Sequence, residues 1–516
     1  MTLISARYLS KFTNNLISML GGIITAIIIP KTLGPAHYGD FNFLRDSFAS
    51  LVNTIDLNSS NAHFIYSSRN SESRKISLFY LYICALVGVI LISIVSVFYL
   101  TGSTNYLWPG QKISYIYAGA ALGFFVYLTA NLTNLSDSKG LTVTIEKYRM
   151  VITFVSIIAL IMLFCLKWLS LPVYFSYALV LQFVLMAYFV YSLKRNSIFD
   201  FRPRKMSAGE VKEVAGYFYN YSSPLIVVLI AGFGINYFDR WFLQLIDGSV
   251  TQGYYSLSLR LSAVCALFTS AMTPLFMQST ARAHAEGRPE HIRIIFDKIQ
   301  VFFFMAALIA VYFSLLSKEI VDIIGANEYS GAIVPITIMM LYPVHQTYGR
   351  FCGAVLLSTE RTDLYRNITI FASLIGLPLS FILIAPERYF GFNLGATGLA
   401  LKMVLIQAIS VNMMLFAACR LIGESFMKFF SRQIGVLTIL SALGLMASFI
   451  GGSLAWGDGK TGSLLKLGFS GPLYLMAALL LCLLFPWVLG LTREELFNYA
   501  RAFLIYLRQG KKCNSR

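Results

Sequence analysis

The chain is poor in charge and in the signatures of soluble enzymes. Only 13% of its 516 residues are charged and 57% are hydrophobic, whereas a soluble domain carries about 25% charged residues. It has no G-x-x-x-x-G-K-[ST] phosphate loop, no H-E-x-x-H zinc motif, no paired-cysteine metal spacing and no Asp-x-Asp triplet of the glycosyltransferase type. The loops between apolar runs are too short for a catalytic domain. A soluble enzyme is therefore excluded, and we expect no metal and no cofactor.

The cysteines and the net charge also have membrane explanations. The seven cysteines fall mostly inside or at the ends of apolar runs, where cysteine usually acts as a small buried hydrophobe. A formal net charge of +17 could indicate nucleic-acid binding, but the basic residues lie in short loops between apolar segments. That distribution favours a membrane and argues against nucleic acid. No small-residue cleavage site follows the first apolar run, so we interpret it as a retained span.

A transmembrane helix needs about 20 mostly apolar residues. We therefore predict an all-α polytopic membrane protein with about fourteen transmembrane helices. They are expected at residues 12–33, 38–65, 76–101, 113–135, 149–168, 171–193, 215–245, 253–280, 299–317, 330–357, 367–385, 393–418, 433–455 and 466–490.

The positions of lysine and arginine agree with this number of spans. With a cytoplasmic N-terminus, 29 of the 41 basic residues fall on inner segments, seven on outer loops and five within spans. Because cytoplasmic loops carry the excess of basic residues, we predict that both termini are cytoplasmic. Omitting the polar second span would reverse the orientation of every later loop, so the bias also supports that span.

Two glycine turns, 214 positions apart, indicate an internal repeat. Leu33-Gly34-Pro-Ala-His-Tyr-Gly39 is followed by Arg45, and Asp247-Gly248-Ser-Val-Thr-Gln-Gly253 is followed by Arg260. A weaker echo relates residues 135–139 to residues 357–361, at an offset of 222. Two echoes at similar offsets argue for duplication of a six-span unit. Because six is even, the two lobes should be related by a parallel repeat.

This repeat divides the chain into five predicted regions. The N-terminal six-helix lobe is 1–193, and the C-terminal six-helix lobe is 215–421. A basic cytoplasmic linker at 194–214 is either a docking site for anionic lipid or a partner, or a topology determinant, and the second interpretation is favoured. Two additional transmembrane helices occupy 422–490. The basic tail at 491–516 has the apolar spacing of an amphipathic helix on the inner membrane face.

Charged residues at membrane depth are the candidate functional residues, because they are costly in lipid unless paired or solvated. Arg45, Arg260, Arg350 and Lys402 are the candidates for phosphate or pyrophosphate binding, since a guanidinium binds phosphate bidentately. Two interpretations stay open for Arg45 and Arg260: substrate binding, or structural pairing with Asp40, Asp46, Asp56 or Asp239. For Lys402, a snorkelling or structural role is favoured.

Further polar residues could line a cavity. Asp46, Asp56 and His63 belong to the second span, whose polarity requires that it face protein or water rather than lipid. Tyr219 and Asn220, at the start of the seventh span, could contact sugar or lie at the inner interface. The chain is thus predicted to be a transporter with a polar interior.

The turn Leu33-Gly-Pro-Ala-His-Tyr-Gly39, the fourteen spans and the six-plus-six repeat resemble the polysaccharide transporters, or Wzx-type O-antigen flippases. That family belongs to the multidrug/oligosaccharidyl-lipid/polysaccharide exporter superfamily, and its members typically carry a Leu-Gly-Pro-x-x-Tyr-Gly turn after the first span. The resemblance implies two lobes around a cationic cavity. It also implies that Arg45, Arg260 and Arg350 contact a pyrophosphate.

From the resemblance, we expect a flippase that moves undecaprenyl-pyrophosphate-linked oligosaccharide units (O-antigen, capsule or exopolysaccharide) from the inner to the outer leaflet of the bacterial cytoplasmic membrane. Expected partners are this lipid-linked oligosaccharide, membrane lipids, and a polysaccharide polymerase and chain-length regulator. The energy source is either an ion gradient or downstream consumption of the product. A cation-coupled multidrug exporter of the same superfamily is the first rival, and a membrane-embedded polysaccharide polymerase the second.

Overall fold

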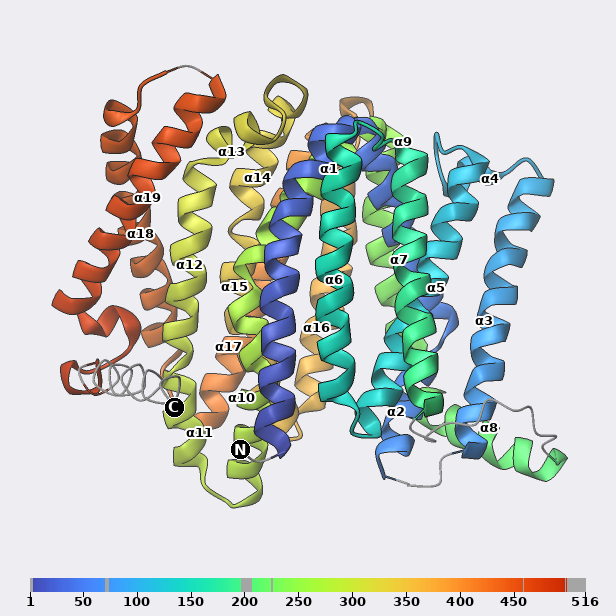
Figure 1. Ribbon diagram of the computed structural model, residues 1–516. Coiled ribbons are helices and arrows are strands. Elements are labelled where there is room, and N and C mark those ends of the chain that lie inside the picture. Colours follow the sequence, from blue (N-terminus) through green and yellow to red (C-terminus); the bar gives the residue numbers. More distant parts are fainter. Residues whose placement is uncertain are drawn as a thin grey trace, which may run out of the picture. The chain divides into compact units, whose positions relative to one another are not determined.

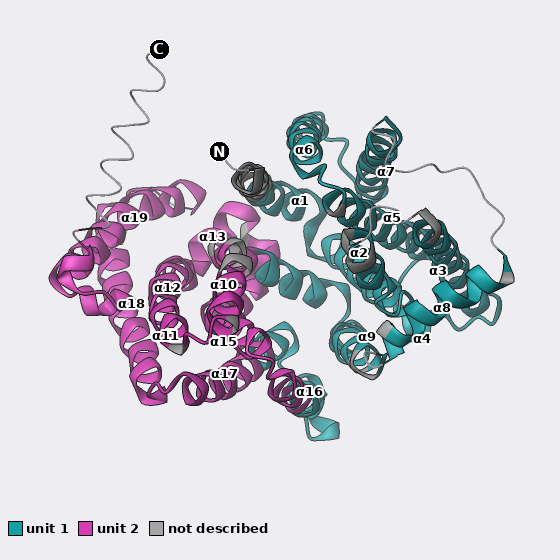
Figure 2. Cartoon of the chain, turned by 90° about the horizontal axis from the view of Figure 1, so that it is seen from below, with its two compact units in different colours: residues 1–260, 373–402 teal, residues 261–372, 403–516 magenta. Residues whose placement is uncertain are grey.

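The computed structural model describes residues 3–69, 74–195, 207–223, 226–457, 459–496 and 498. Within these ranges every regular element is a helix and no strand is found (Figure 1). The all-α prediction is therefore confirmed. The chain forms two compact units, one of residues 1–260 with 373–402 and one of residues 261–372 with 403–516 (Figure 2).

The helices follow the sequence from one unit to the next. Unit 1 begins with α1 (Leu3–Ile55), α2 (Ser59–Arg69), α3 (Arg74–Leu100), α4 (Thr104–Leu107), α5 (Ile113–Ser138), α6 (Thr142–Cys165), α7 (Leu171–Arg195), α8 (Ala208–Ser222) and α9 (Ile226–Cys265). Unit 2 contains α10 (Leu267–Ala285), α11 (Pro289–Asp297), α12 (Ile299–Leu315), α13 (Ser317–Ile324), η2 (Ala326–Ala332), α14 (Ile333–Met339), α15 (Tyr342–Ser358), α18 (Phe426–Leu454), α19 (Gly459–Leu484) and η4 (Pro486–Leu489).

Three of the described helices are divided between the units. The last turn of α9, from residue 261 on, belongs to unit 2. In the hairpin of α16 (Thr362–Ile384), η3 (Glu387–Tyr389) and α17 (Gly395–Ile422), residues 373–402 belong to unit 1, and the start of α16 and the end of α17 belong to unit 2. The predicted lobes 1–193 and 215–421 place the whole hairpin in the second lobe. The lobe boundaries remain a prediction, and the compact units are a different division of the same helices.

Nine helical segments in the described part of the chain are long and apolar enough to cross a membrane. They correspond to nine of the predicted spans. The other five, at 12–33, 38–65, 215–245, 253–280 and 330–357, also fall on helices, but on ones that are interrupted or carry polar residues. Residues 215–222 belong to the separate helix α8, so the seventh long helix begins at Ile226 rather than at 215.

Parts of two predicted regions lie outside the described residues. Residues 196–206 of the 194–214 linker, and most of the 491–516 tail, are not described. The described part of the linker resumes at Ser207. This residue caps α8 through a reciprocal pair of hydrogen bonds with Glu210. Such a capping box satisfies two backbone N–H groups at a helix start.

The two predicted glycine turns have the same backbone conformation. Gly34 interrupts α1 with φ 70° and ψ 169°, and Gly248 interrupts α9 with φ 75° and ψ −170°. Only glycine adopts this region readily, because a Cβ would clash with the backbone. Each glycine therefore ends one long helical segment and starts the next, and this supports the predicted repeat.

The two turns also pack against each other inside unit 1. A Cβ on Gly39 would overlap the carbonyl oxygen of Ser249, and a Cβ on Gly253 would overlap that of Pro35. Since Ser249 and Gly253 are 214 positions after Pro35 and Gly39, the contact is symmetric: each turn offers the same surface to the other. The Ser249 hydroxyl donates to Asp40 across this crossing.

The second echo is also visible in the backbone. The helix α5 ends with the N–H of Leu141 bonded to the carbonyl of Ser136, and α15 ends with the N–H of Arg361 bonded to that of Leu356. Gly140 and Glu360, just before these donors, both have positive φ. This register corresponds to an offset of 220 rather than the 222 of the sequence echo.

The second segment of α1 packs closely on α5 through its apolar residues. A Cβ on Gly119 would lie 2.9 Å from Leu44 Cβ, and a Cβ on Gly123 would lie 2.9 Å from Phe48 Cβ. Small residues four apart allow such close approach of membrane helices. Figure 1 shows α5, α6 and α7 beside α1 in this unit.

We expect Gly253→Ala to destabilise the protein strongly, because its methyl group would meet backbone rather than a movable side chain. Overpacking of this kind costs roughly 1–3 kcal/mol or more. The measurement is the thermal unfolding temperature of the purified protein in detergent. Gly232→Ala on the same helix is the matched control, since no atom lies within 4 Å of the added Cβ; equal unfolding temperatures for both variants would contradict the close crossing.

Candidate functional site

A cluster of charged side chains lies half-way along the second segment of α1. Arg45 and Asp46 are about ten residues, or roughly 15 Å, from either end of the segment 35–55. The Arg45 guanidinium contacts Oδ1 of Asp46 through Nε at 2.8 Å and Nη2 at 2.7 Å. The side chains of Arg45 and Asp46 keep 30% and 22% of their surface accessible, so the pair is reachable by a ligand.

A second arginine reaches the same carboxylate from α9. Arg240 Nη2 lies 2.8 Å from Oδ2 of Asp46, while the buried Nη1 of Arg240 has no hydrogen-bond partner among the described residues. Arg45 lies over the ring of Phe41 at 6.0 Å, and Arg240 lies over that of Tyr255 at 5.3 Å. These two rings are 214 positions apart, so the repeat supplies one aromatic face to each guanidinium.

Arg260 completes the cluster electrostatically. It lies close enough to Asp46 and Tyr174 to influence both, and no ion-pair partner is found for it among the described residues. Two guanidiniums thus contact one carboxylate and a third acts on it electrostatically, which leaves the cluster with an excess of two positive charges. The offset of 214 makes Arg260 the equivalent of Asp46 rather than of Arg45. Arg45 and Arg260, which follow the two glycine turns, are therefore one residue away from equivalent positions in the repeat.

Lys402 belongs to a separate, buried ion pair. Its ammonium group contacts Oδ2 of Asp239, and the Ser380 hydroxyl donates to Oδ1 of the same carboxylate. The side chains of Lys402 and Asp239 are only 4% and 8% exposed. Within unit 1 this triad fastens the α16–α17 hairpin to α9, in accord with the structural role favoured for Lys402.

Asp56 ends the second segment of α1 and organises a hydrogen-bond network. Its Oδ1 accepts hydrogen bonds from Ser59 Oγ at 2.7 Å and Tyr127 Oη at 2.6 Å, and its Oδ2 accepts one from the backbone N–H of Ser60 at 3.1 Å. Leu57 and Asn58, which follow it, have positive φ, so the chain turns here before α2 begins. The carboxylate is 4% exposed and fully engaged with protein donors.

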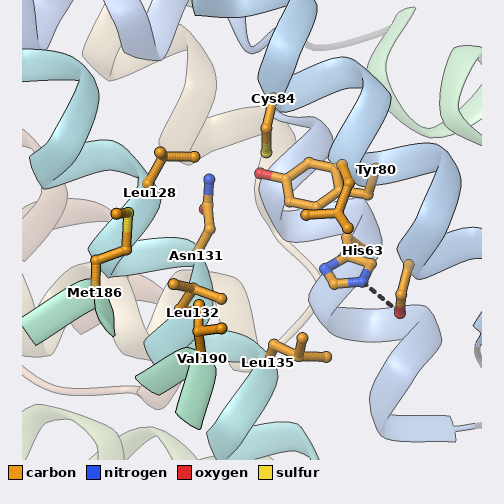
Figure 3. A pocket seen from close by; sticks show the side chains of 11 residues that line it. His63, Tyr80, Cys84, Leu128, Asn131, Leu132, Leu135, Met186 and Val190 are labelled. Atoms are coloured by element: carbon orange, nitrogen blue, oxygen red, sulfur yellow. Dashed lines mark hydrogen bonds between the residues drawn. The ribbon is translucent and has the colours of Figure 1, made fainter. Parts of the chain in front are cut away.

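His63 lies beside that network at the wall of a small cavity in unit 1. It contacts Ser77 Oγ through Nε2 at 3.0 Å and stacks on Tyr80 with the ring centroids 4.5 Å apart (Figure 3). The cavity, of about 150 Å³, is also lined by Cys84 and Asn131. Lys139, in the loop after α5, lies near enough to act on His63, and burial lowers the pKa of Lys139.

The remaining candidates are Tyr219, Asn220 and Arg350. Tyr219 and Asn220 are exposed on α8, with Tyr219 at 69%. Arg350 belongs to unit 2, where its Nη2 approaches Gln346 Oε1 at 3.5 Å and Tyr342 lies nearby. Their binding roles remain predictions. Arg240 is not among the predicted binding residues, because its contact with Asp46 depends on helix packing that sequence spacing does not reveal.

Comparisons with known proteins agree with the fold. A family model described as "Polysaccharide biosynthesis protein" matches residues 6–279, just over half of the chain. No curated protein sequence gives a significant match.

Three solved structures illustrate the likeness. A lipid II flippase, MurJ, in an inward closed conformation is 12% identical, with 92% of this chain and 98% of that chain covered and a TM-score of 0.64. An inward-facing multidrug resistance MATE family transporter of the MOP superfamily is 15% identical, with 80% and 94% covered and a TM-score of 0.59. A MOP superfamily transporter from Pyrococcus furiosus, whose binding pocket is described as reversed in polarity, is 15% identical, with 82% and 95% covered and a TM-score of 0.54. At these identities, the likeness shows a shared fold.

Replacing Asp46 by Asn should destabilise the protein, because two partly buried guanidiniums would lose their only carboxylate within the described residues. Breaking a buried ion pair by removing one partner costs about 3–5 kcal/mol, and the partial exposure here places the expectation at the lower end. Thermal unfolding in detergent measures the effect. Asp363→Asn, which alters an exposed carboxylate on α16, should leave the unfolding temperature unchanged; an equally unchanged Asp46→Asn would rule out the pairing.

The triad of Lys402, Asp239 and Ser380 gives a double-variant test. Lys402→Met alone should lower the unfolding temperature, because Asp239 would remain charged and buried. Lys402→Met combined with Asp239→Leu should recover most of the loss, since apolar side chains can replace a buried ion pair without penalty. The Ser380 hydroxyl would then donate to the carbonyl of Gly376 instead. A double variant no more stable than the single one would refute the pairing.

Proposed function

The chain belongs to the polysaccharide biosynthesis protein family and has the fold of MOP superfamily transporters, and from that premise we propose that it is a flippase for polyprenyl-pyrophosphate-linked oligosaccharide units. The proposed substrate carries an O-antigen, capsule or exopolysaccharide repeat unit on undecaprenyl pyrophosphate. The proposed site of action is the bacterial cytoplasmic membrane, with both termini on the cytoplasmic side.

The observation that carries this proposal is the charge of the Asp46 cluster. Arg45, Arg240 and Arg260 outweigh a single carboxylate at mid-helix depth, where an uncompensated cation is costly. A pyrophosphate diester carries about two negative charges, and it would neutralise the excess of the cluster. Guanidinium forks suit its oxygens, because each can donate two parallel hydrogen bonds.

The proposed roles of the three arginines follow from the partners that each one has. Arg45 and Arg240 are held in place by Asp46 and by aromatic rings, so they are positioned before any substrate arrives. The guanidinium of Arg260 and the accessible part of Arg45 are the groups left to bind phosphate oxygens. Side chains fixed in this way lose little conformational entropy when they bind.

We propose transport by alternating access rather than catalysis. The sugar and pyrophosphate would occupy a polar interior while the polyprenyl tail stays in lipid. Arg350, Asp56, His63, Tyr219 and Asn220 are retained as candidate contacts along the path. A polysaccharide polymerase and a chain-length regulator are the proposed downstream partners.

The rival function is export of cationic drugs, since multidrug transporters share the fold. Coulomb repulsion from three arginines disfavours a cation at the Asp46 cluster. One superfamily transporter is itself described as having a pocket of reversed polarity with a different function. The positive charge of the cluster therefore supports an anionic substrate.

The test is made in a strain that lacks the gene. We expect completed single repeat units on polyprenyl pyrophosphate to accumulate while surface polysaccharide is lost, as extraction and chromatography of the lipid-linked intermediates would show. The wild-type gene should restore export, and Arg260→Glu should not, although the protein is inserted at normal levels. Arg282→Gln is the control, because that arginine is 82% exposed and pairs only with Glu286 in the described chain. Normal polymer without accumulated intermediate, together with increased drug sensitivity, would favour the exporter instead.

A further inference from the structure

A groove opens between α16 and α17 within unit 2. Its volume is about 790 Å³, which is within the usual range of roughly 300–1,000 Å³ for ligand sites. The first two turns of α16 form one wall and the last four turns of α17 form the other. The lining consists of Arg361, Leu364, Ile368, Ile409, Asn412, Met413, Phe416, Ala417, Arg420, Leu421 and Phe426.

The charges of this groove have one sign. Arg361 and Arg420 are its only charged lining residues, both are exposed, and neither has an ion-pair partner among the described residues. The acid that follows α17, Glu424, is already paired with Arg293 and Lys428. Glu360 and Asp363 flank Arg361 in the sequence but do not line the groove. Two guanidiniums are therefore available to an anion.

The rest of the groove is apolar. Ile368 is buried, and the Phe416 and Phe426 rings meet edge to face with centroids 5.9 Å apart at the end nearest Arg420. Asn412 adds one polar atom, its buried Oδ1, which has no partner among the described residues. The surface thus joins two cations at the helix ends to an apolar trough that runs along the helices.

We propose that this groove binds an anionic phospholipid of the surrounding leaflet, with the phosphate head group between Arg361 and Arg420 and an acyl chain along the apolar wall. The charge of the lining selects an anionic head, and the apolar walls select a molecule that also has a hydrocarbon chain. Basic pockets between transmembrane helices on the cytoplasmic side are suited to such head groups. The predicted topology places both arginines on that side.

This binding has a structural consequence. The α16–α17 hairpin is fastened to α9 by the Lys402 triad at its other end, so a lipid between Arg361 and Arg420 would join the same two helices at their opposite ends. The spacing of α16 and α17 would then be set by a protein contact at one end and by a membrane lipid at the other.

The experiment is native mass spectrometry of the purified full-length protein titrated with phosphatidylglycerol or with phosphatidylethanolamine. The wild type should retain phosphatidylglycerol preferentially. Arg361→Gln combined with Arg420→Gln should weaken phosphatidylglycerol retention about 30-fold, because each basic residue near an anionic lipid surface contributes roughly a factor of five. Phosphatidylethanolamine retention should not change. Ile409→Trp, which fills the trough and keeps both arginines, should also weaken phosphatidylglycerol binding.

The control is Arg366→Gln, an exposed arginine on the same helix that contacts Asn367 and does not line the groove. Its retention of phosphatidylglycerol should equal that of the wild type. The proposal is overturned if the double variant binds phosphatidylglycerol as well as the wild type does, or if Arg366→Gln loses as much. Displacement of the lipid by inorganic phosphate alone would identify a simple anion site. Displacement by polyprenyl diphosphate at far lower concentration would identify a substrate groove.

Discussion

In a hydrocarbon environment, every charged or polar group must be satisfied by the protein itself, and this constraint governs the structure from its helices to its site. Asp46 forms ion pairs with Arg45 and Arg240, and Asp239 forms one with Lys402. Asp56 accepts hydrogen bonds from hydroxyl and backbone amide groups. The second span tolerates its polarity because Asp46 is paired with two arginines and Asp56 accepts a hydrogen bond from Tyr127 of α5. Within the Asp46 cluster, Arg260 is the arginine for which the described part of the chain shows no ion-pair partner, and this is why we propose that it binds the ligand.

The repeat explains how such a crowded polar centre can be built from two long helices. Gly34 and Gly248 let each helix break and continue at a new angle, and Gly39 and Gly253 let the two resulting segments touch backbone to backbone. Side chains that follow these glycines are consequently brought near one another from both halves of the sequence. The same duplication supplies an aromatic ring to each of the two arginines that share Asp46.

The sequence was sufficient to predict the features that depend on local composition. Hydropathy located the long helices, and the polar second span was recovered because the bias of basic residues required it. The glycine turns were found because only glycine tolerates their backbone conformation. The features that escaped prediction depend on packing between distant segments: the contact of Arg240 with Asp46 and the pairing of Lys402 with Asp239. The one-residue displacement between Arg45 and Arg260 was missed because the spacing from each glycine to its arginine differs by one.

The division of α16 and α17 between two compact units has a consequence for any attempt to separate the halves of the chain. A cut in the 194–214 linker would leave Asp239, its partner Lys402 and the whole hairpin in the same C-terminal fragment, but would remove the α1 segment whose Gly39 seats Gly253 and whose Asp46 neutralises Arg240. The C-terminal fragment would thus keep the ion pair of Lys402 with Asp239. It would expose Arg240 without its carboxylate, and the backbone around Gly253 without its packing partner. The two halves therefore depend on each other for packing. Fragments that are coexpressed should reassemble, whereas each fragment alone lacks the other's contact surface.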